Sequence, residues 1–347
     1  MRAAVFRGRK EVAVTDVEEP TAGPGQVKVA VAYNGICGTD LHEYYAGPIF
    51  VPTAPHPLTG GQLPVTLGHE FAGTVTEVGD GVEQIAEGDR VTIEPVYRCD
   101  QCPPCRAGHY NVCQQIGFHG LMADGGMAQY TVVEARMVHK LPDAVSLELG
   151  ALVEPMAVAY HAARRGNVGA GDTAVVFGAG PIGIGIWFAL RGLGVEDVTV
   201  VEPSQVRRDA LVPLGATDVI DPETTDPAEH IAERTGGRGA DGVYDAAGVR
   251  PAVEAGLRCL GSHRQMIAVA IYEAPFPVSL LDLVLRESGV SGSLCYTSED
   301  YRAVIELMAR GRYDTTGWVS HIQLDDVIEG FERLHAGKAM KLLVEPS

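Results

Sequence analysis

The chain has 347 residues, of which 46% are hydrophobic and 21% are charged, and its formal net charge is −18. This length allows two domains with cores of their own, and the acidic balance disfavours nucleic acids and anionic membranes as partners. The N-terminus lacks the apolar core of a signal peptide, so we expect a cytoplasmic protein. The seven cysteines are then expected to be thiols or metal ligands rather than disulfides.

Short strands separated by glycine and proline fill the first part of the chain. They are predicted at 2–7, 12–16, 26–33, 71–78, 90–93, 127–133 and 137–140. Evenly spaced strands of this kind are typical of a partly closed antiparallel barrel. The sequence therefore predicts a β-barrel domain over residues 1–154.

Strands and helices alternate from about residue 156. After a strand–helix–strand unit at 173–202, helices are predicted at 204–214, 228–235 and 251–259, and strands at 218–220, 242–245, 264–269 and 290–294. Alternation of this kind predicts an α/β domain with a doubly wound parallel sheet, here over residues 155–296. Helices at 299–310 and 324–336 and a strand at 341–344 do not continue the sheet, so we expect residues 297–347 to complete the first domain.

Three glycines join the first strand of this region to its first helix. Gly178 permits the tight turn, Gly180 lets a pyrophosphate approach the backbone, and Gly183 lets the helix lie close to the strand. The phosphates are expected at the start of the helix, which Pro181 and Ile182 form, because the free amides and the positive end of the helix dipole lie there. The turn thus predicts a dinucleotide site.

An acid follows the second strand of this unit. Glu202 lies nineteen residues after Gly183, where its carboxylate is expected to accept hydrogen bonds from the adenosine ribose. A 2′-phosphate about 4 Å from that carboxylate would be opposed by roughly 4 kcal/mol per unit charge at an effective dielectric near 20. The sequence therefore predicts NAD rather than NADP, although Arg207 and Arg208 lie close behind and would weaken the preference.

Four cysteines lie within fifteen residues, at Cys99, Cys102, Cys105 and Cys113. Disulfides between cysteines so close in sequence are geometrically awkward, whereas four thiolates complete a tetrahedral zinc site. We therefore predict a structural zinc site without an open position. A redox pair at Cys102 and Cys105, or a lobe that has lost its metal, are the alternatives.

A second set of possible ligands is scattered along the chain. It comprises Cys37, His69, Glu70 and Glu154. Scatter alone is a weak signal, because a single histidine is usually structural and Glu-Pro commonly begins a helix. These residues need further support before they predict a metal site.

That support comes from a resemblance. The scattered set, the cysteine lobe and the glycine turn together resemble the zinc-dependent medium-chain dehydrogenase/reductase superfamily over essentially the whole chain. Glu154, where many alcohol dehydrogenases carry a cysteine, is similar to the polyol and sorbitol branch; residues 47–50, 56–60 and 151–159 resemble the (R,R)-2,3-butanediol dehydrogenases. The resemblance implies a GroES-like barrel, a Rossmann cofactor domain, and a cleft between them that holds a catalytic zinc.

The resemblance also implies a reaction, the NAD-linked oxidation of a small diol to a ketone or its reverse. Cys37, His69 and Glu154 would hold the catalytic zinc with one position open, and Glu70 would bind it directly or shape its surroundings. The zinc would act as a Lewis acid and let a coordinated alcohol ionise near neutral pH. With the cysteine lobe, this makes two zinc ions per chain.

Family positions suggest further roles. Thr39 and His42 would form the relay that carries the released proton to solvent. Val269, Ser293 and Leu294 would contribute to the NAD pocket, and the strand at 290–294 would pair with its copy in a homodimer or homotetramer.

Two alternatives remain open from the sequence. A sorbitol, xylitol or other polyol dehydrogenase would share every catalytic residue and differ in the size and polarity of its pocket. From another class, the chain would be a cofactor-binding protein without catalysis. His56 and His119 are weaker candidates to border the substrate site.

Overall fold

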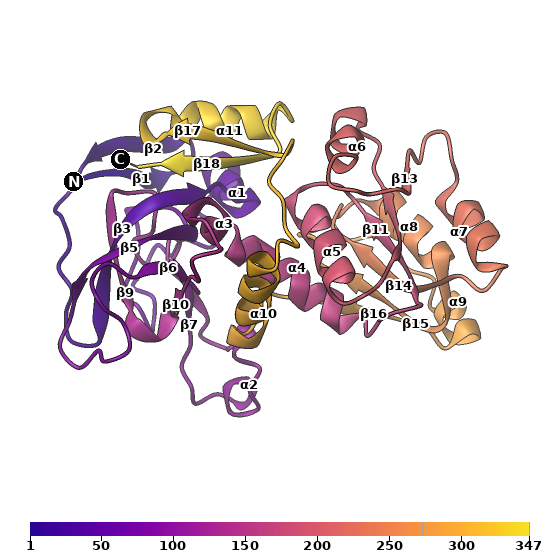
Figure 1. Cartoon of the computed structure of the whole chain (residues 1–347), viewed down its shortest axis with the longest axis horizontal. Coiled ribbons are helices and arrows are strands. Elements are labelled where there is room, and N and C mark those ends of the chain that lie inside the picture. Colours follow the sequence, from indigo (N-terminus) through magenta and orange to yellow (C-terminus); the bar gives the residue numbers. More distant parts are fainter. Residues whose placement is uncertain (273, 347) are drawn as a thin grey trace. The chain divides into compact units, whose positions relative to one another are not determined.

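The computed structural model describes residues 1–272 and 274–346, which form two compact units (Figure 1). The first unit contains Met1–Glu154, Thr297–Arg310 and Val319–Ser347, and the second contains Pro155–Tyr296 and Gly311–Trp318. Among the described residues, no helix is both long enough and apolar enough to cross a bilayer.

The first unit is built on two main sheets. One has the order β2 (Glu11–Asp16), β1 (Arg2–Gly8), β4 (Val65–Thr66). The other has the order β10 (Val138–Lys140), β6 (Arg90–Ile93), β5 (Glu70–Val78), β3 (Gln26–Gly35), β18 (Lys341–Glu345), β17 (Val319–Gln323), and β9 (Tyr130–Glu134) also pairs with β3. All its strand pairs are antiparallel except β17 with β18. The C-terminal strands thus rejoin the first unit, as the sequence predicts.

Short elements complete this unit. They are α1 (Gly38–Ala46), β7 (Val96–Tyr97), α2 (Pro103–Arg106), β8 (Gly117–Phe118), α3 (Leu147–Ala151), α10 (Ser298–Ala309) and α11 (Val327–His335), with 3₁₀ turns at Tyr110–Val112, Ala135–Met137 and Leu324–Asp326. The alternation in β3 explains its place, because Val27, Val29 and Val31 are buried and pack in one core with residues of β5 and β6.

The second unit is a six-stranded parallel sheet (Figure 1). Its order is β13 (Val219–Ile220), β12 (Asp197–Val201), β11 (Thr173–Phe177), β14 (Ala240–Asp245), β15 (Leu260–Ala268), β16 (Gly289–Gly292). Its helices are α4 (Val153–Arg165), α5 (Pro181–Gly192), α6 (Gln205–Leu211), α7 (Pro227–Thr235), α8 (Arg250–Cys259) and α9 (Leu280–Arg286), and α4 begins two residues before the unit does. Every residue of β11 is buried, as a central strand covered on both faces requires. The order reverses between β11 and β14, which confirms the doubly wound sheet.

The structure differs from the predictions in several places. The strand predicted at 127–133 begins only at Tyr130, because the backbone of Met127 instead bonds to Ala4 and Leu67. The strand predicted at 290–294 ends at Gly292. Residues Gly311–Trp318, assigned from sequence to the first domain, belong to the second unit, where Tyr313 packs against Phe188 at a ring distance of 4.9 Å.

Candidate active site and metal centres

The four cysteines predicted to hold a structural zinc converge in space. Their sulfur atoms all lie within 4.8 Å of one another, and Sγ–Sγ distances are 4.0 Å for Cys99 and Cys105, 3.9 Å for Cys102 and Cys113, and 3.5 Å for Cys99 and Cys113. Zn–S bonds of about 2.3 Å in a tetrahedron give edges of about 3.8 Å. All four are free thiols, so the donor set fits a closed zinc site.

Backbone amides support thiolates in this lobe. The amide of Cys102 donates to Cys99 Sγ at 3.3 Å, and that of Gln115 donates to Cys113 Sγ at 3.4 Å. Hydrogen bonding from the backbone of Gln114 lowers the pKa of Cys102 to about 6, whereas burial raises the pKa of Cys105 to about 12. Zinc binds thiolates, so the backbone amides that donate to sulfur favour the form of these cysteines that binds the metal.

The second cluster brings together residues that are distant in sequence. Atoms of Cys37, His69 and Glu70 able to bind a metal lie within 4.8 Å of one another. Antiparallel pairing of β3 with β5 sets Gly35 opposite Glu70, and Cys37 follows two residues later as the N-cap of α1. A Cβ on Gly35 would lie 2.1 Å from Glu70 Oε2, so a side chain there would displace the carboxylate.

A buried acid that was not predicted from the sequence faces the histidine. The fully buried Asp40 has Oδ1 at 3.7 Å from His69 Nδ1, and neither atom has a hydrogen-bond partner among residues 1–272 and 274–346. Its other oxygen accepts from the amide of Cys37 at 2.9 Å. Burial raises the pKa of Asp40 to about 6. With Nδ1 facing a carboxylate, Nε2 is the nitrogen left for a metal. The only signal in the sequence is its position three residues after Cys37, in the first turn of a helix.

The charges around His69 favour a cation. Burial by itself would lower the pKa of His69, but Asp40, Cys37 and Glu154 outweigh burial and raise it well above the usual value. A buried cluster of a thiol, an imidazole and carboxylates is a donor set that suits zinc. The residues present therefore fit a zinc ion.

A buried lysine, also missed from sequence, faces Glu70. Lys341 on β18 is 2% exposed, forms an ion pair with Glu70, and donates to the carbonyl of Ile36 at 3.0 Å. Burial would lower the pKa of Lys341, but the charges of Glu70 and Cys37 raise it. Nothing in the sequence distinguishes this lysine from the exposed lysines that commonly flank edge strands.

Glu154 lies near the cluster but is not among the three residues whose ligand atoms lie within 4.8 Å of one another. It is 5% exposed and occupies the first turn of α4, where the helix dipole favours a carboxylate. Its charge acts on His69, Lys341 and Tyr301. The structure thus brings Cys37, His69 and Glu70 together and holds Glu154 close by.

The two residues of the predicted proton relay lie on α1. Thr39 Oγ1 is 3.7 Å from Cys37 Sγ, and His42 follows one turn later and is partly exposed. Within the described part of the chain, no hydrogen bond joins Thr39 to His42. Their spacing on one helix makes them neighbours along its surface.

The glycine turn of the second unit has the geometry its sequence predicts. Gly178 has a φ of 95°, in the left-handed region that favours glycine. A Cβ on Gly183 would lie 1.9 Å from the carbonyl oxygen of Gly178, whereas a Cβ on Gly180 would meet nothing within 4 Å. Gly180 is the N-cap of α5, and Pro181 is its first residue. Free space therefore lies beside the helix terminus that would bind phosphate.

Glu202 directly follows β12 and is 3% exposed. Its carboxylate accepts from the amides of Ala179 at 2.7 Å and Ser204 at 2.9 Å. Arg207 lies 3.8 Å from it with an exposed side chain. Arg208 is instead engaged by the carbonyl of Glu202 at 2.7 Å and by Asp221 at 2.9 Å.

The other predicted NAD contacts lie past the carboxyl ends of strands. Val269 follows β15 and its amide donates to the carbonyl of Asp245 at 3.0 Å. Ser293 and Leu294 follow β16. The hydroxyl of Ser293 is buried without a hydrogen-bond partner in the part of the chain that the structure describes, and Leu294 is 53% exposed. In a parallel sheet these ends share an edge with Gly178, which is the edge that binds ligands in doubly wound folds.

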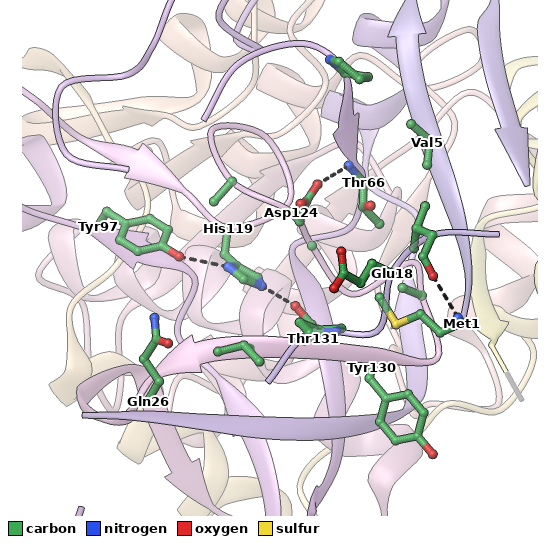
Figure 2. Close-up of a pocket in the computed structure, with 17 residues that line it drawn as sticks. Met1, Val5, Glu18, Gln26, Thr66, Tyr97, His119, Asp124, Tyr130 and Thr131 are labelled. Carbon is green, nitrogen blue, oxygen red and sulfur yellow. Dashed lines mark hydrogen bonds between the residues drawn. The ribbon is translucent and has the colours of Figure 1, made fainter. Parts of the chain in front are cut away.

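A separate cavity of about 480 Å³ lies in the first unit, and Figure 2 shows the residues that line it. At its wall, His119 lies between the hydroxyls of Tyr97, at 3.0 Å, and Thr131, at 2.7 Å. Burial lowers the pKa of His119 to about 3, so the ring is neutral. None of the candidate zinc ligands lines this cavity, and the suggested role of His119 at a substrate site stays a prediction.

Known proteins share both the fold and the length of this chain. Residues 23–143 match the alcohol dehydrogenase GroES-like domain, and residues 181–310 match the zinc-binding dehydrogenase domain. The chain is 42% identical to the (R,R)-butanediol dehydrogenase of Bacillus subtilis over 100% of both chains. The crystal structure of 2R,3R-butanediol dehydrogenase from Bacillus subtilis is similar with a TM-score of 0.93 and 41% identity, covering 100% of this chain and 99% of that one. A protein of Sinorhizobium meliloti described as a zinc-binding dehydrogenase, solved with NADP bound, has a TM-score of 0.91 and 30% identity over 99% of each chain.

Proposed function

The chain belongs to the zinc-dependent medium-chain dehydrogenases, and we propose that it interconverts (R,R)-2,3-butanediol and acetoin with NAD as cofactor. The observation that carries this proposal is full-length identity of 42% to a butanediol dehydrogenase, in a chain whose Cys37, His69 and Glu70 converge. Reduction of diacetyl would be the same chemistry one oxidation level higher.

We propose that Cys37, His69 and Glu154 hold the catalytic zinc. Glu70 is closer to the other two ligands, but its carboxylate is neutralised by the buried Lys341, and a carboxylate so paired is a weaker metal ligand. Glu154 is buried near the cluster, and its charge acts on His69. Glu70 would then hold the surroundings of the metal in place, together with Asp40.

Zinc bound there would act as a Lewis acid on the substrate oxygen and lower the pKa of the alcohol. The protein positions this chemistry through its own side chains. Asp40 faces the ring of His69 at 3.7 Å, and Lys341 offsets part of the negative charge of the cluster. Thr39, 3.7 Å from the sulfur of Cys37, would accept the alcohol proton, and His42, partly exposed one turn further on, would release it to solvent.

The cofactor would bind to the second unit with its pyrophosphate at the start of α5. NAD would supply the hydride acceptor. Glu202 would accept hydrogen bonds from the ribose and disfavour a 2′-phosphate. Val269, Ser293 and Leu294 would contribute contacts at the same edge of the sheet. The four cysteines of the lobe would hold a second zinc with a structural role, since their set leaves no open position.

We also propose that the protein is a homodimer or a homotetramer. Strand β16 ends the parallel sheet, so one of its edges is unpaired among the described residues. Next to it in sequence, α9 exposes Leu280, Leu281, Val284 and Leu285, each by 65% or more. An apolar helix beside an open strand edge favours pairing with a second copy. A monomer by light scattering would contradict this.

A substrate panel tests the proposed activity. We expect the purified protein to form NADH from (R,R)-2,3-butanediol with a higher kcat/KM than from its stereoisomers, sorbitol or xylitol, and to use NADP less efficiently. Higher kcat/KM for sorbitol would identify a polyol dehydrogenase. Absence of cofactor reduction with every alcohol, in protein loaded with zinc, would favour a cofactor-binding protein without catalysis.

A further inference from the structure

A fully buried carboxylate outside the metal cluster is not used by the proposed mechanism. Glu43 lies on α1 and has no exposed surface. Its two oxygens accept from the backbone amides of Ile49, Phe50 and Val51, at 2.9 Å for Ile49 and 3.3 Å for Val51. Three successive amides thus converge on one side chain, an arrangement that binds an anion well.

No cationic side chain pairs with Glu43 in the described part of the chain. A buried charge is costly unless hydrogen bonds compensate for it, and here the compensation comes from backbone alone. Replacing such a group by an apolar side chain would be the simpler way to stabilise a core. The arrangement is therefore best explained by the geometry that it imposes on residues 47–51.

The same segment is also fixed at its start. Gly47 caps α1, with its amide donating to the carbonyl of Glu43 at 2.9 Å. A Cβ on Gly47 would lie 2.5 Å from both that carbonyl oxygen and the carboxylate of Glu43. At the other end, Val51 is 3% exposed and packs in the core of the unit. The segment is held at both ends and along its backbone.

The exposed side chains of the segment 47–51 include two apolar ones. The side chains of Ile49 and Phe50 are 51% and 41% exposed, although their amides are bound by Glu43. Glu43 lies four residues after Thr39 on α1, so the two side chains are neighbours on one face of the helix. Cys37 caps the same helix. Ile49 and Phe50 are therefore attached, through Glu43, to the helix that carries a zinc ligand and the proton relay.

We propose that Glu43 is a positioning residue that fixes Ile49 and Phe50 as an apolar wall beside the substrate site. Such a wall favours a short substrate with a methyl group next to the carbinol carbon and disfavours a polyol, whose further hydroxyls would lose hydrogen bonds to water against it. The inference rests on the proposed function, because it assumes a small secondary alcohol bound near Thr39.

The test combines a readout of the segment with a readout of specificity. Glu43→Gln keeps the size of the side chain but turns an amide group toward backbone donors. We expect hydrogen exchange at the amides of Ile49, Phe50 and Val51 to become at least tenfold faster, as measured on the zinc-loaded full chain. The ratio of kcat/KM for butanediol to kcat/KM for sorbitol should fall about tenfold, mainly through a higher KM for butanediol.

Two further variants control the interpretation. Phe50→Ser should lower the same ratio while exchange at Ile49 and Val51 stays slow, because the carboxylate remains. Glu87→Gln, at an exposed site in the same unit, should change neither readout. If Glu43→Gln leaves exchange unchanged, or speeds exchange without altering the ratio, the positioning role is wrong. If wild type prefers sorbitol while Glu43→Gln still loses protection, the proposed substrate and the apolar wall are wrong, but Glu43 still holds the segment.

Discussion

The two clusters that suit zinc are encoded in opposite ways. The lobe takes all its sulfur atoms from Cys99–Cys113, a segment of fifteen residues with little secondary structure. The other cluster takes Cys37 from the N-cap of α1, His69 from the residue before β5 and Glu70 from the first residue of β5. Glu154 lies nearby on α4, and Lys341 on β18 pairs with Glu70. The cysteine cluster is formed by one segment of the chain, whereas the dispersed cluster forms only when distant segments come together in the folded unit.

This difference agrees with what each cluster can do. Four thiolates from one loop fill a tetrahedron, so a bound ion has no position left for substrate and its binding energy stabilises the loop. Mixed donors held by separate elements leave a position open, and the elements keep that geometry when substrate binds. We therefore propose that the dispersed cluster serves catalysis and the local cluster serves stability, and variants can separate these roles.

The largest effect should follow from His69→Ala. Loss of this ligand removes Lewis-acid catalysis, which contributes several kcal/mol, so kcat/KM should fall about a thousandfold or more. Zinc content should drop from two ions per chain to one, while the free energy of unfolding of the lobe stays close to that of wild type. Elemental analysis with a steady-state assay measures both. Cys259→Ala, which removes a buried thiol outside both clusters, should keep both ions and full activity.

The reciprocal change is Cys105→Ser. It should also remove one zinc ion, but the consequence should be a loss of about 3 kcal/mol in the free energy of unfolding and faster proteolysis between residues 99 and 113. The initial rate per folded molecule should stay within a few-fold of wild type. Loss of chemistry with unchanged stability would show that the lobe takes part in the reaction and would break the comparison.

These contrasts also show which parts of the molecule its sequence can predict. The lobe, the glycine turn and the alternating elements of the second unit are local patterns, and the fold predicted from them is confirmed. The sequence does not indicate helix α1. Two of the residues that this helix buries are Asp40 and Glu43, and charged residues are normally expected on the surface, so the pattern does not show a buried helix face.

The sequence does not predict that Asp40 and Lys341 lie at the metal cluster, and the physical reason is the same for both. Each is buried only because a partner distant in sequence compensates its charge, His69 for Asp40 and Glu70 for Lys341. A pattern of residue types along the chain carries no information about such pairs. The family resemblance identifies the scattered candidate ligands, but it does not identify the charged residues that lie beside them.

Two variants sharpen the assignment within the dispersed cluster. If Glu154 binds the metal, Glu154→Gln should weaken catalytic zinc about 100-fold, since a neutral amide replaces a charged ligand. Glu70→Gln should weaken it less, by about tenfold, as is usual for residues that support ligands. Competition with a chelator measures both affinities in the absence of substrate. The reverse order would make Glu70 the ligand.

The smallest expected effect is on stability, and it tests which hydrogen bonds connect the cysteine lobe to the rest of the first unit. Glu94, just after β6, is 3% exposed and accepts hydrogen bonds from Tyr110 at 2.6 Å, His139 at 3.0 Å and Ser298. Tyr110 lies inside the lobe, three residues before Cys113, so this carboxylate connects the lobe to β10 and to the start of α10. Glu94→Gln should lower the free energy of unfolding by about 1–3 kcal/mol at pH 7.

The pH dependence distinguishes this role from simple packing. Burial by itself would raise the pKa of Glu94, but hydrogen bonds from His139, Ser298 and Tyr110 outweigh it and the pKa is lowered. A lowered folded-state pKa gives stability that is complete above the ordinary glutamate value and is lost as the pH falls through the folded-state pKa. The difference between wild type and Glu94→Gln in urea unfolding should therefore be present at pH 6 and shrink below about pH 4. A difference independent of pH down to 3 would mean that packing, and not the ionised carboxylate, fastens the lobe.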